Sequence, residues 1–332
     1  MDTFKLCSFL LVLAALLSAG ITWAIRPLLQ RYALARPNAR SSHRVPTPQG
    51  AGIGVIAVTL SLAGICAIAM NFTIPAAVFG ATLGILLVGA ADDIKSIPVL
   101  PRLVLQAAAV GAIIFTTPDD LRLIPAWPLW FEGILLLLAG LWFVNLVNFM
   151  DGLDLMTIAE IVPVTASMIL LGSIGEFPLP ATIVAAALFG AMLGFAPFNR
   201  PIAKVFLGDV GSLPIGLLVG WCLMQLAFHH MTAALLLPLY YLTDATITLA
   251  RRVVKREPFW TAHRTHFYQR ATDNGFTASR VVGEVFALNI ALAVLAFGSV
   301  RAGSALIDIL VGLIGAAAVV LLLYRFSRKR SL

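Results

Sequence analysis

Long apolar runs, each bounded by charged residues, glycine or proline, follow one another along the whole chain. A helix needs about 20 apolar residues to cross the hydrocarbon core of a bilayer. Helices also satisfy every backbone polar group without water, as a spanning segment must. The pattern predicts eleven spanning helices, at roughly residues 4–25, 51–70, 74–90, 103–116, 133–150, 155–173, 180–198, 210–228, 232–250, 281–299 and 304–324. The expected fold is an all-α polytopic membrane protein.

The composition excludes other classes of protein. Of 332 residues, 60% are hydrophobic and 12% are charged, and the mean hydropathy is +0.95. Soluble domains carry about 25% charged residues, so we exclude soluble, disordered, fibrous and disulfide-stapled chains. The cysteines, Cys7, Cys66 and Cys222, lie inside apolar runs and indicate neither disulfides nor a metal site. We expect one integral-membrane domain over residues 1–332, whose first run is a retained anchor.

Basic residues predict the orientation of the chain. Of 23 lysines and arginines, 20 lie in segments that follow odd-numbered spans, and only Lys5, Arg122 and Arg301 lie on the other side. Because cytoplasmic loops carry the excess of basic residues, these segments and the C-terminus are expected inside and the N-terminus outside. The net charge of +7 is then mostly topogenic. It does not indicate a nucleic-acid partner.

Carboxylates gather at the same predicted face. Five aspartates lie at cytoplasmic helix ends, namely Asp92, Asp93, Asp151, Asp154 and Asp209, and Asp244 lies about two turns inside the ninth span. Any single one could simply cap a helix. The adjacent pair Asp92-Asp93 is different, because like charges repel unless a cation joins them. Carboxylates suit Mg²⁺ or Mn²⁺, and the nearby Lys95 and Arg102 suit phosphate, so the set indicates metal-assisted phosphoryl transfer.

Four further stretches belong to this face. Residues 40–52 form a basic loop with His43 and Arg44, residues 145–154 carry Asn145 and Asn148 on one helical face, and residues 206–212 flank Asp209 with glycines. Residues 263–270 form a loop rich in histidine and arginine. The alternatives are a membrane re-entry turn for the first, polar contacts between helices for the asparagines, and an interfacial basic loop for the last.

These motifs, in this order, resemble the polyprenyl-phosphate N-acetylhexosamine-1-phosphate transferases, glycosyltransferase family 4, over about residues 26–280. The family's Asp-Asp motif matches Asp92-Asp93, with Arg102 and Gln106 after it. Its later motifs match Asn145 to Asp154, Gly208 to Ser212, and Asp244 before Arg251-Arg252. Of the family's His-x-His-His, only His266 matches, because Tyr268 and Gln269 replace the other histidines. This variant is closer to members that start lipopolysaccharide O-antigen synthesis.

The resemblance implies a reaction and its partners. N-acetylhexosamine-1-phosphate would pass from a UDP-N-acetylhexosamine to undecaprenyl phosphate, giving undecaprenyl-diphosphate-sugar and UMP, in one displacement or through a phospho-aspartate. The enzyme would use Mg²⁺, with Mn²⁺ as a substitute, and lie in a bacterial inner membrane among membrane lipids with its site facing the cytoplasm. A homodimer is left open. The active-site loops would be about residues 26–50, 90–102, 145–155, 199–212 and 251–280.

The resemblance also assigns roles to residues. The catalytic residues would be Asp92, Asp93, Asp209 and His266, and the metal ligands Asp209 and Asn148. Substrate would be bound by His43, Arg44, Lys95, Arg102, Asn145, Asp151, Gly152, Asp154, Asp244 and Arg264.

Two other functions compete with this interpretation. A transporter of ions or polyprenol-linked lipids would also bury acids, but those are expected at mid-bilayer on broken helices. A CDP-alcohol-type phosphotransferase would need a dense run of four acids, which the sequence lacks.

Overall fold

The computed structural model describes residues 3–35, 45–258 and 263–329. The helices are α1 (Thr3–Tyr32), α2 (Gly52–Met70), α3 (Ala76–Ile94), α4 (Val99–Phe115), α5 (Leu129–Met150), α6 (Met156–Ser173), α7 (Leu179–Phe195), the short 3₁₀ helix η1 (Ala196–Phe198), α8 (Asp209–Ala227), α9 (Met231–Leu236), α10 (Leu239–Val254), α11 (Phe267–Asp273), α12 (Ala278–Ala302) and α13 (Ala305–Ser327). Two short strands, β1 (Leu34–Ala35) and β2 (Thr47–Pro48), pair antiparallel with Leu34 opposite Pro48.

The helices have the length and composition of membrane spans. Within the described ranges, nine are long and apolar enough to cross a bilayer, and α4 is a shorter apolar helix of 17 residues. The predicted all-α polytopic fold is confirmed. Ten of the eleven predicted spans each correspond to one helix, and the first is longer than expected because α1 continues to Tyr32.

The ninth predicted span is wrong as a single helix. In place of residues 232–250 the chain forms α9 and α10, and the break lies at Leu237 and Pro238. Proline lacks a backbone N–H and its ring collides with the preceding turn, so it ends one helix and begins the next. Apolar composition alone did not reveal this break, because both halves are equally able to lie in a membrane.

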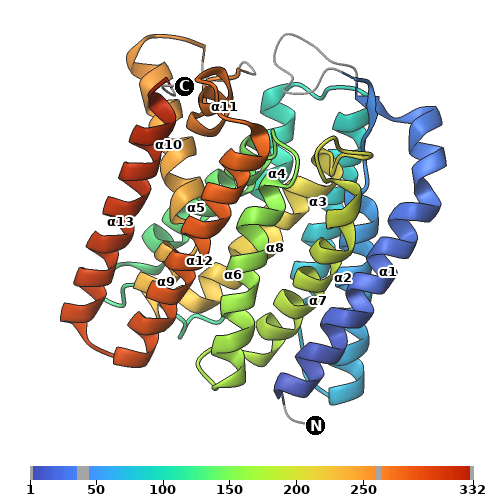
Figure 1. Ribbon diagram of the computed structural model, residues 1–332. Coiled ribbons are helices and arrows are strands. Elements are labelled where there is room, and N and C mark those ends of the chain that lie inside the picture. The colour runs from blue at the N-terminus through green and yellow to red at the C-terminus, as the bar shows by residue number, and fades with distance from the viewer. Residues whose placement is uncertain (1–2, 36–44, 259–262, 330–332) are drawn as a thin grey trace.

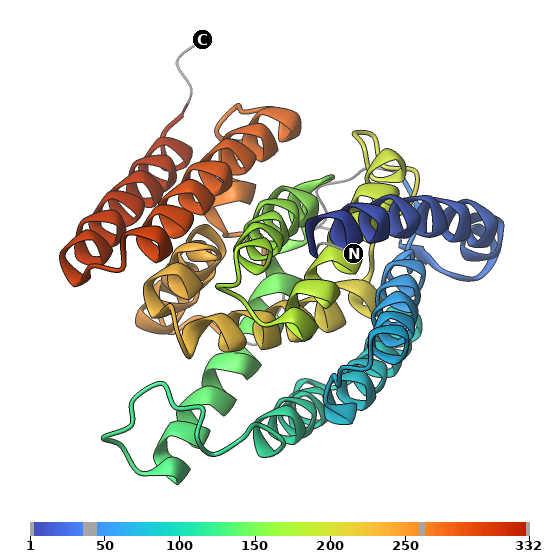
Figure 2. The ribbon, with the colours of Figure 1, turned by 90° about the horizontal axis from the view of Figure 1, so that it is seen from below.

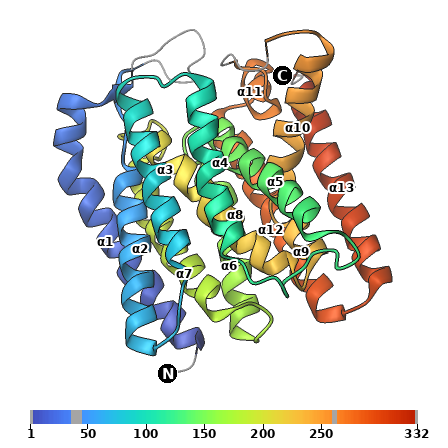
Figure 3. The same cartoon turned by 180° about the vertical axis from the view of Figure 1, so that it is seen from behind.

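The helices form one broad bundle with α1 and α13 at opposite edges (Figures 1 and 3). Viewed along the bundle, α6, α7 and α8 lie between these edges (Figure 2). Helix α8 packs against α2, α3 and α5, and most of its residues are buried. This central helix therefore has little freedom to move relative to its neighbours.

One end of the bundle collects the loops that matter below. Helices α3, α5 and α7 end there, and α4, α6 and α8 begin there. The N- and C-termini lie at opposite ends of the bundle, and the C-terminus is at the end with α11 (Figure 1). We call this end the C-terminal face. Its orientation toward the cytoplasm stays a prediction.

Candidate active site

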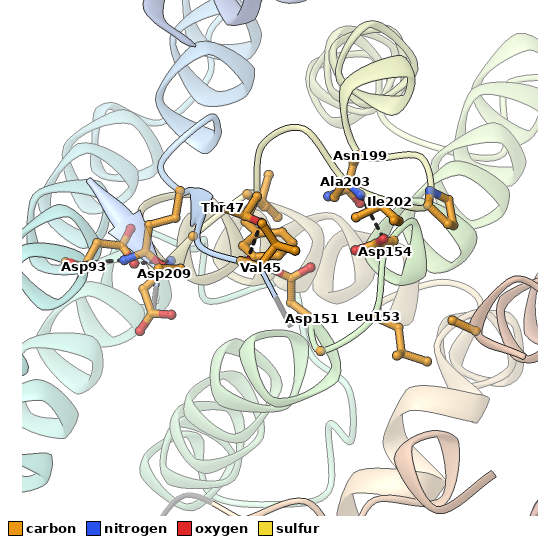
Figure 4. A pocket seen from close by; sticks show the side chains of 18 of the residues that line it. Val45, Thr47, Asp93, Asp151, Leu153, Asp154, Asn199, Ile202, Ala203 and Asp209 are labelled. Carbon is orange, nitrogen blue, oxygen red and sulfur yellow. Dashed lines mark hydrogen bonds between the residues drawn. The ribbon is translucent and has the colours of Figure 1, made fainter. Parts of the chain in front are cut away.

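A cavity of about 560 Å³ opens at the C-terminal face. Every one of the five loops expected from the sequence contributes to its wall. The lining residues are Ala35, Val45, Thr47, Gln49, Asp93, Asn148, Asp151, Gly152, Leu153, Asp154, Asn199, Pro201, Ile202, Ala203, Phe206, Leu207, Gly208, Asp209, Gln269 and Ala278. Asp93 and Asp209 lie at one end of it, Asp154 and Ala203 at the other, and Asp151 between them (Figure 4).

Asp93, near the end of α3, fixes the first turn of α8. The backbone N–H of Asp209 donates to Asp93 Oδ1 (3.0 Å), and that of Val210 donates to Oδ2 (3.1 Å). The first N–H groups of a helix lack partners inside the helix and carry partial positive charge, so a carboxylate is well suited to bind them. Asp93 therefore couples α3 to α8 at the cavity.

Glycines allow this close packing. A Cβ at Gly89 would lie 2.3 Å from the Asp209 carbonyl oxygen, and a Cβ at Gly52 would lie 2.1 Å from Gly211 Cα. The loop before α2 is also bonded to the loop before α8, because Gly52 N–H donates to the Leu207 carbonyl (2.9 Å). Helices α2 and α3 thus meet the start of α8 at backbone contact distance and fix the place of Asp209.

The Asp209 side chain lies among polar groups from three other helices. Asn148 Nδ2 donates to Asp209 Oδ1 (2.8 Å) and to Ser212 Oγ (2.9 Å). Arg102 Nη1 lies 2.9 Å from Asp92 Oδ2 and 3.8 Å from Asp209 Oδ2. The Arg102 guanidinium therefore faces the carboxylates of Asp92 and Asp209. The negative charge of Asp93 is compensated by the backbone N–H groups at the N-terminus of α8.

The loop after α5 supplies the other carboxylates. The Thr157 hydroxyl donates to Asp151 Oδ1, and the backbone N–H of Ala203 donates to Asp154 Oδ2 (3.0 Å). Burial raises the pKa of Asp151 to about 7, and the charges of Asp93 and Asp154 act in the same direction. A carboxyl with this pKa exchanges its proton readily near neutral pH.

Tyr268 on α11 contacts the end of α5 and the loop that follows it. Its hydroxyl donates to the Phe149 carbonyl (3.0 Å), and its ring is fully buried. A Cβ at Gly152 would lie only 2.1 Å from the Tyr268 hydroxyl oxygen. Glycine at 152 is therefore required by Tyr268, which stands where the family pattern has histidine.

Asp244 on α10 does for α11 what Asp93 does for α8. Its carboxylate accepts from the backbone N–H groups of Phe267 (3.0 Å) and Tyr268 (3.1 Å), and His266 Nδ1 lies 3.3 Å from Oδ1. Asp244 has no exposed surface, and His266 is 4% exposed. Neither residue is in the cavity wall, so the geometry gives both a positioning role toward α11.

Other expected site residues lie away from the cavity. Asn145 is buried and donates to Gln106 Oε1 on α4 (2.7 Å), as in the alternative of polar contact between helices. Lys95 is exposed at the end of α3, and Arg264 pairs with Asp273 (3.2 Å) and Thr272. His43 and Arg44 lie outside the described residues.

Several lining residues were not predicted individually. Asn199 accepts from Leu155 N–H (2.7 Å) and donates to the Val205 carbonyl (3.1 Å), which ties the loop before α8 to the start of α6. Gln49 donates to the Asp93 carbonyl (3.1 Å). The glycine- and proline-rich sequence around both residues indicated loops, but no motif distinguished these amides.

The charge of the site is compatible with a divalent cation. Asp92, Asp93 and Asp209 lie close together, and Arg102 is the cation paired with Asp92 and Asp209. No group of three or more His, Cys, Asp or Glu side chains converges on one metal position within residues 3–35, 45–258 and 263–329. The Asp209 carboxylate offers the hard oxygens that Mg²⁺ binds, and the Asn148 amide, which presents Nδ2 to Asp209 Oδ1, would have to turn to offer its oxygen.

Comparison with known proteins places this site in context. Residues 75–227 match the family model described as glycosyl transferase family 4. The chain is 30% identical to a decaprenyl-phosphate N-acetylglucosaminephosphotransferase of Mycolicibacterium smegmatis, over 62% of this chain and 57% of that protein. It is 26% identical to the enzyme of the same name from Mycobacterium tuberculosis (86% of this chain, 80% of that one). It is also 26% identical to a phospho-N-acetylmuramoyl-pentapeptide-transferase of Streptococcus mutans (78% and 84%).

Proposed function

We propose, from the premise that this chain is related to glycosyl transferase family 4, that it transfers an N-acetylhexosamine-1-phosphate group from a UDP-sugar to undecaprenyl phosphate. An oxygen of the lipid phosphate attacks the β-phosphorus of the UDP-sugar. The bond from that phosphorus to the bridging oxygen breaks, UMP leaves with that oxygen, and the sugar C1–O bond stays intact.

The observation that carries the proposal is the placing of Asp93, Asp209 and Asn148 in the same cavity as Asp151 and Asp154. A diphosphate at the end of the cavity with Asp93 and Asp209 would lie beside Arg102, which is 3.8 Å from Asp209. A uracil or sugar would extend toward the end of the cavity with Asp154 (Figure 4). Phosphoryl transfer depends mainly on such positioning and on charge compensation. The names of the relatives, which all describe phosphotransferases, support the same reaction class.

Mg²⁺, held by Asp209 and Asn148, would neutralise charge that develops on the diphosphate. Asp93 fixes the first turn of α8 and hence the Asp209 carboxylate. Arg102 orients phosphate oxygens as a permanent cation, because guanidinium does not lose its proton in proteins.

An apolar cavity of about 240 Å³ supports a prenyl acceptor. It lies between α4, α5, α8 and α9, and its wall includes Phe143, Val144, Gly216 and Trp221. Phe143 and Val144 precede Asn148 by four to five residues, which is about 6–7.5 Å along a helix. The prenyl chain of a lipid whose phosphate lies beside Asn148 would therefore extend into this apolar cavity.

One feature expected of a transporter is present, because α9 and α10 form a broken helix that carries a buried acid. The Asp244 carboxylate, however, binds the backbone of α11, Tyr240 and Thr248. Both carboxylate oxygens of Asp244 accept hydrogen bonds that fix the first turn of α11, so they are not available to bind a transported ion. This arrangement favours the transferase over the transporter.

The test is an assay of purified protein with radiolabelled UDP-sugars, undecaprenyl phosphate and Mg²⁺. We expect a lipid-linked radiolabelled product and UMP, and no product when EDTA removes the metal. Comparing UDP-N-acetylhexosamines identifies the donor sugar. Absence of product with every sugar would contradict the proposal.

A further inference from the structure

Pro163 interrupts the backbone hydrogen bonds of α6 inside the bundle. In a regular helix the N–H of residue 163 would donate to the Ala159 carbonyl, but proline has no N–H. Asn289 on the neighbouring helix α12 supplies the missing donor, because its Nδ2 atom lies 2.9 Å from the Ala159 oxygen (Figure 1). A side chain distant in the sequence thus completes the hydrogen bonding of α6.

The same amide binds Glu160, an acidic residue that the site described above does not use. Asn289 Nδ2 lies 2.7 Å from Glu160 Oε2, and both residues are 1% exposed. Among the described residues, no lysine, arginine or histidine forms an ion pair with Glu160. The Tyr241 hydroxyl of α10 donates instead to the Met156 carbonyl (3.0 Å). An ionised carboxylate here would be costly, because it would lie inside a membrane-spanning bundle without a counter-charge.

Two oxygen atoms of this pair lack a partner. Glu160 Oε1 and Asn289 Oδ1 are buried and form no hydrogen bond within the part of the chain that the structure describes. Exchanging the nitrogen and oxygen of the Asn289 amide does not help, because Nδ2 already donates to two acceptors. A proton on Glu160 provides for both atoms, since a carboxylic acid has an O–H donor that an amide oxygen can accept.

We propose that Glu160 is a positioning residue held as an uncharged carboxylic acid, whose Oε2 accepts from Asn289 Nδ2 and whose O–H donates to Asn289 Oδ1. The pair fixes α12 to the first turns of α6, where Pro163 leaves the backbone incomplete. Thr157, three residues before Glu160, donates to Asp151 in the cavity wall. The pair therefore sets where α6 presents that bond, and this effect on catalysis rests on the proposed function.

Infrared difference spectroscopy of the wild type against Glu160→Gln tests the protonation at about pH 7, where a glutamate in water is ionised. We expect the wild type to show a protonated-carboxyl C=O band that shifts in D₂O and that the variant lacks. The control Glu176→Gln replaces a carboxylate whose side chain is 41% exposed, and it should leave this band in place. If Glu160→Gln loses an ionised-carboxylate band instead, the proposal is overturned.

Melting temperature and initial rate test the positioning role. Glutamine at 160 keeps an acceptor and donors in the same place, so Glu160→Gln should melt within a few degrees of the wild type and keep its rate. Glu160→Leu removes both bonds to Asn289 and should lower the melting temperature and reduce the rate about 3- to 10-fold, the usual effect of a lost neutral hydrogen bond.

Equal losses in Glu160→Gln and Glu160→Leu would overturn the proposal, because they would show that a negative charge is needed at this position. An unchanged rate in Glu160→Leu would overturn the positioning role. A wild-type protein without turnover of any UDP-sugar would contradict the proposed function, and the infrared and melting comparisons would still decide the state of Glu160.

Discussion

Gly152 and Tyr268 offer a direct test of how the cavity is built. In Gly152→Ala, the new methyl group would lie 2.1 Å from the Tyr268 hydroxyl oxygen and 3.1 Å from its Cζ atom. Overpacking of this kind in a close-packed interior costs about 1–3 kcal/mol. Tyr268 is fully buried, so its ring has no free space into which to move.

Removing the hydroxyl should relieve that collision. Tyr268→Phe alone loses the bond to the Phe149 carbonyl, which costs about 1–3 kcal/mol because it leaves a polar group without its partner. In the double variant the atoms nearest the new methyl group are then Gln269 Nε2 and the ring Cζ at position 268, both at 3.1 Å, and small shifts can accommodate these contacts. The double variant should therefore be about as stable as Tyr268→Phe, and more stable than the sum of the single changes by about 1–3 kcal/mol.

Thermal unfolding of the four purified proteins in lipid nanodiscs measures this coupling. Binding of UDP-sugar gives a second measure, because the loop that Tyr268 supports carries Asp151 and Asp154. We expect Gly152→Ala to weaken binding and the added Tyr268→Phe to restore part of it. Strictly additive changes in melting temperature would show that Tyr268 does not limit residue 152.

Three further predictions concern the metal, the orientation and α11. Asp209→Asn should fold normally but lose about 10²- to 10³-fold in Mg²⁺-dependent rate, by analogy with removal of one preorganised charged partner; near-normal turnover at ordinary Mg²⁺ would disprove the ligand assignment. Tags at Leu332 and beside Arg256 should report the cytoplasm and a tag in residues 119–123 the opposite side, and a periplasmic report from residue 256 would separate α11 from the carboxylates. His266→Ala should reduce the initial rate more than His263→Ala, since His266 lies 3.3 Å from Asp244, and the reverse order would move the role to His263.

The fold could be predicted from the sequence where one property decided it. Apolar runs set the position of most helices, because length and hydrophobicity alone determine whether a segment can span a bilayer. The break at Pro238 was missed because a proline inside an apolar run is tolerated in many membrane helices. Only the packing of α9 and α10 shows which outcome applies here.

The sequence predicted which loops form the site, but not every contact of the predicted site residues. Motif order predicted that loops distant in sequence would meet, and Asp93, Asn148, Asp151, Asp154 and Asp209 do line one cavity. The sequence did not reveal that Asn145 turns toward Gln106, or that Asp244 faces α11. These contacts depend on which helices are neighbours, and helical spacing within one segment carries no such information.

The helix-capping carboxylates change how loss-of-function data for this protein should be interpreted. Asp93 and Asp244 each bind two backbone amides at the start of a helix that is distant in sequence. An asparagine at either position would turn an N–H donor toward donors. In a mutational scan, an inactive Asp93 variant thus reports a displaced α8 as readily as a missing reactant. The Asp209 carboxylate contacts the side chains of Asn148 and Arg102 and no backbone amide that the described residues supply. Inactivity of an Asp209 variant therefore reports lost chemistry more directly.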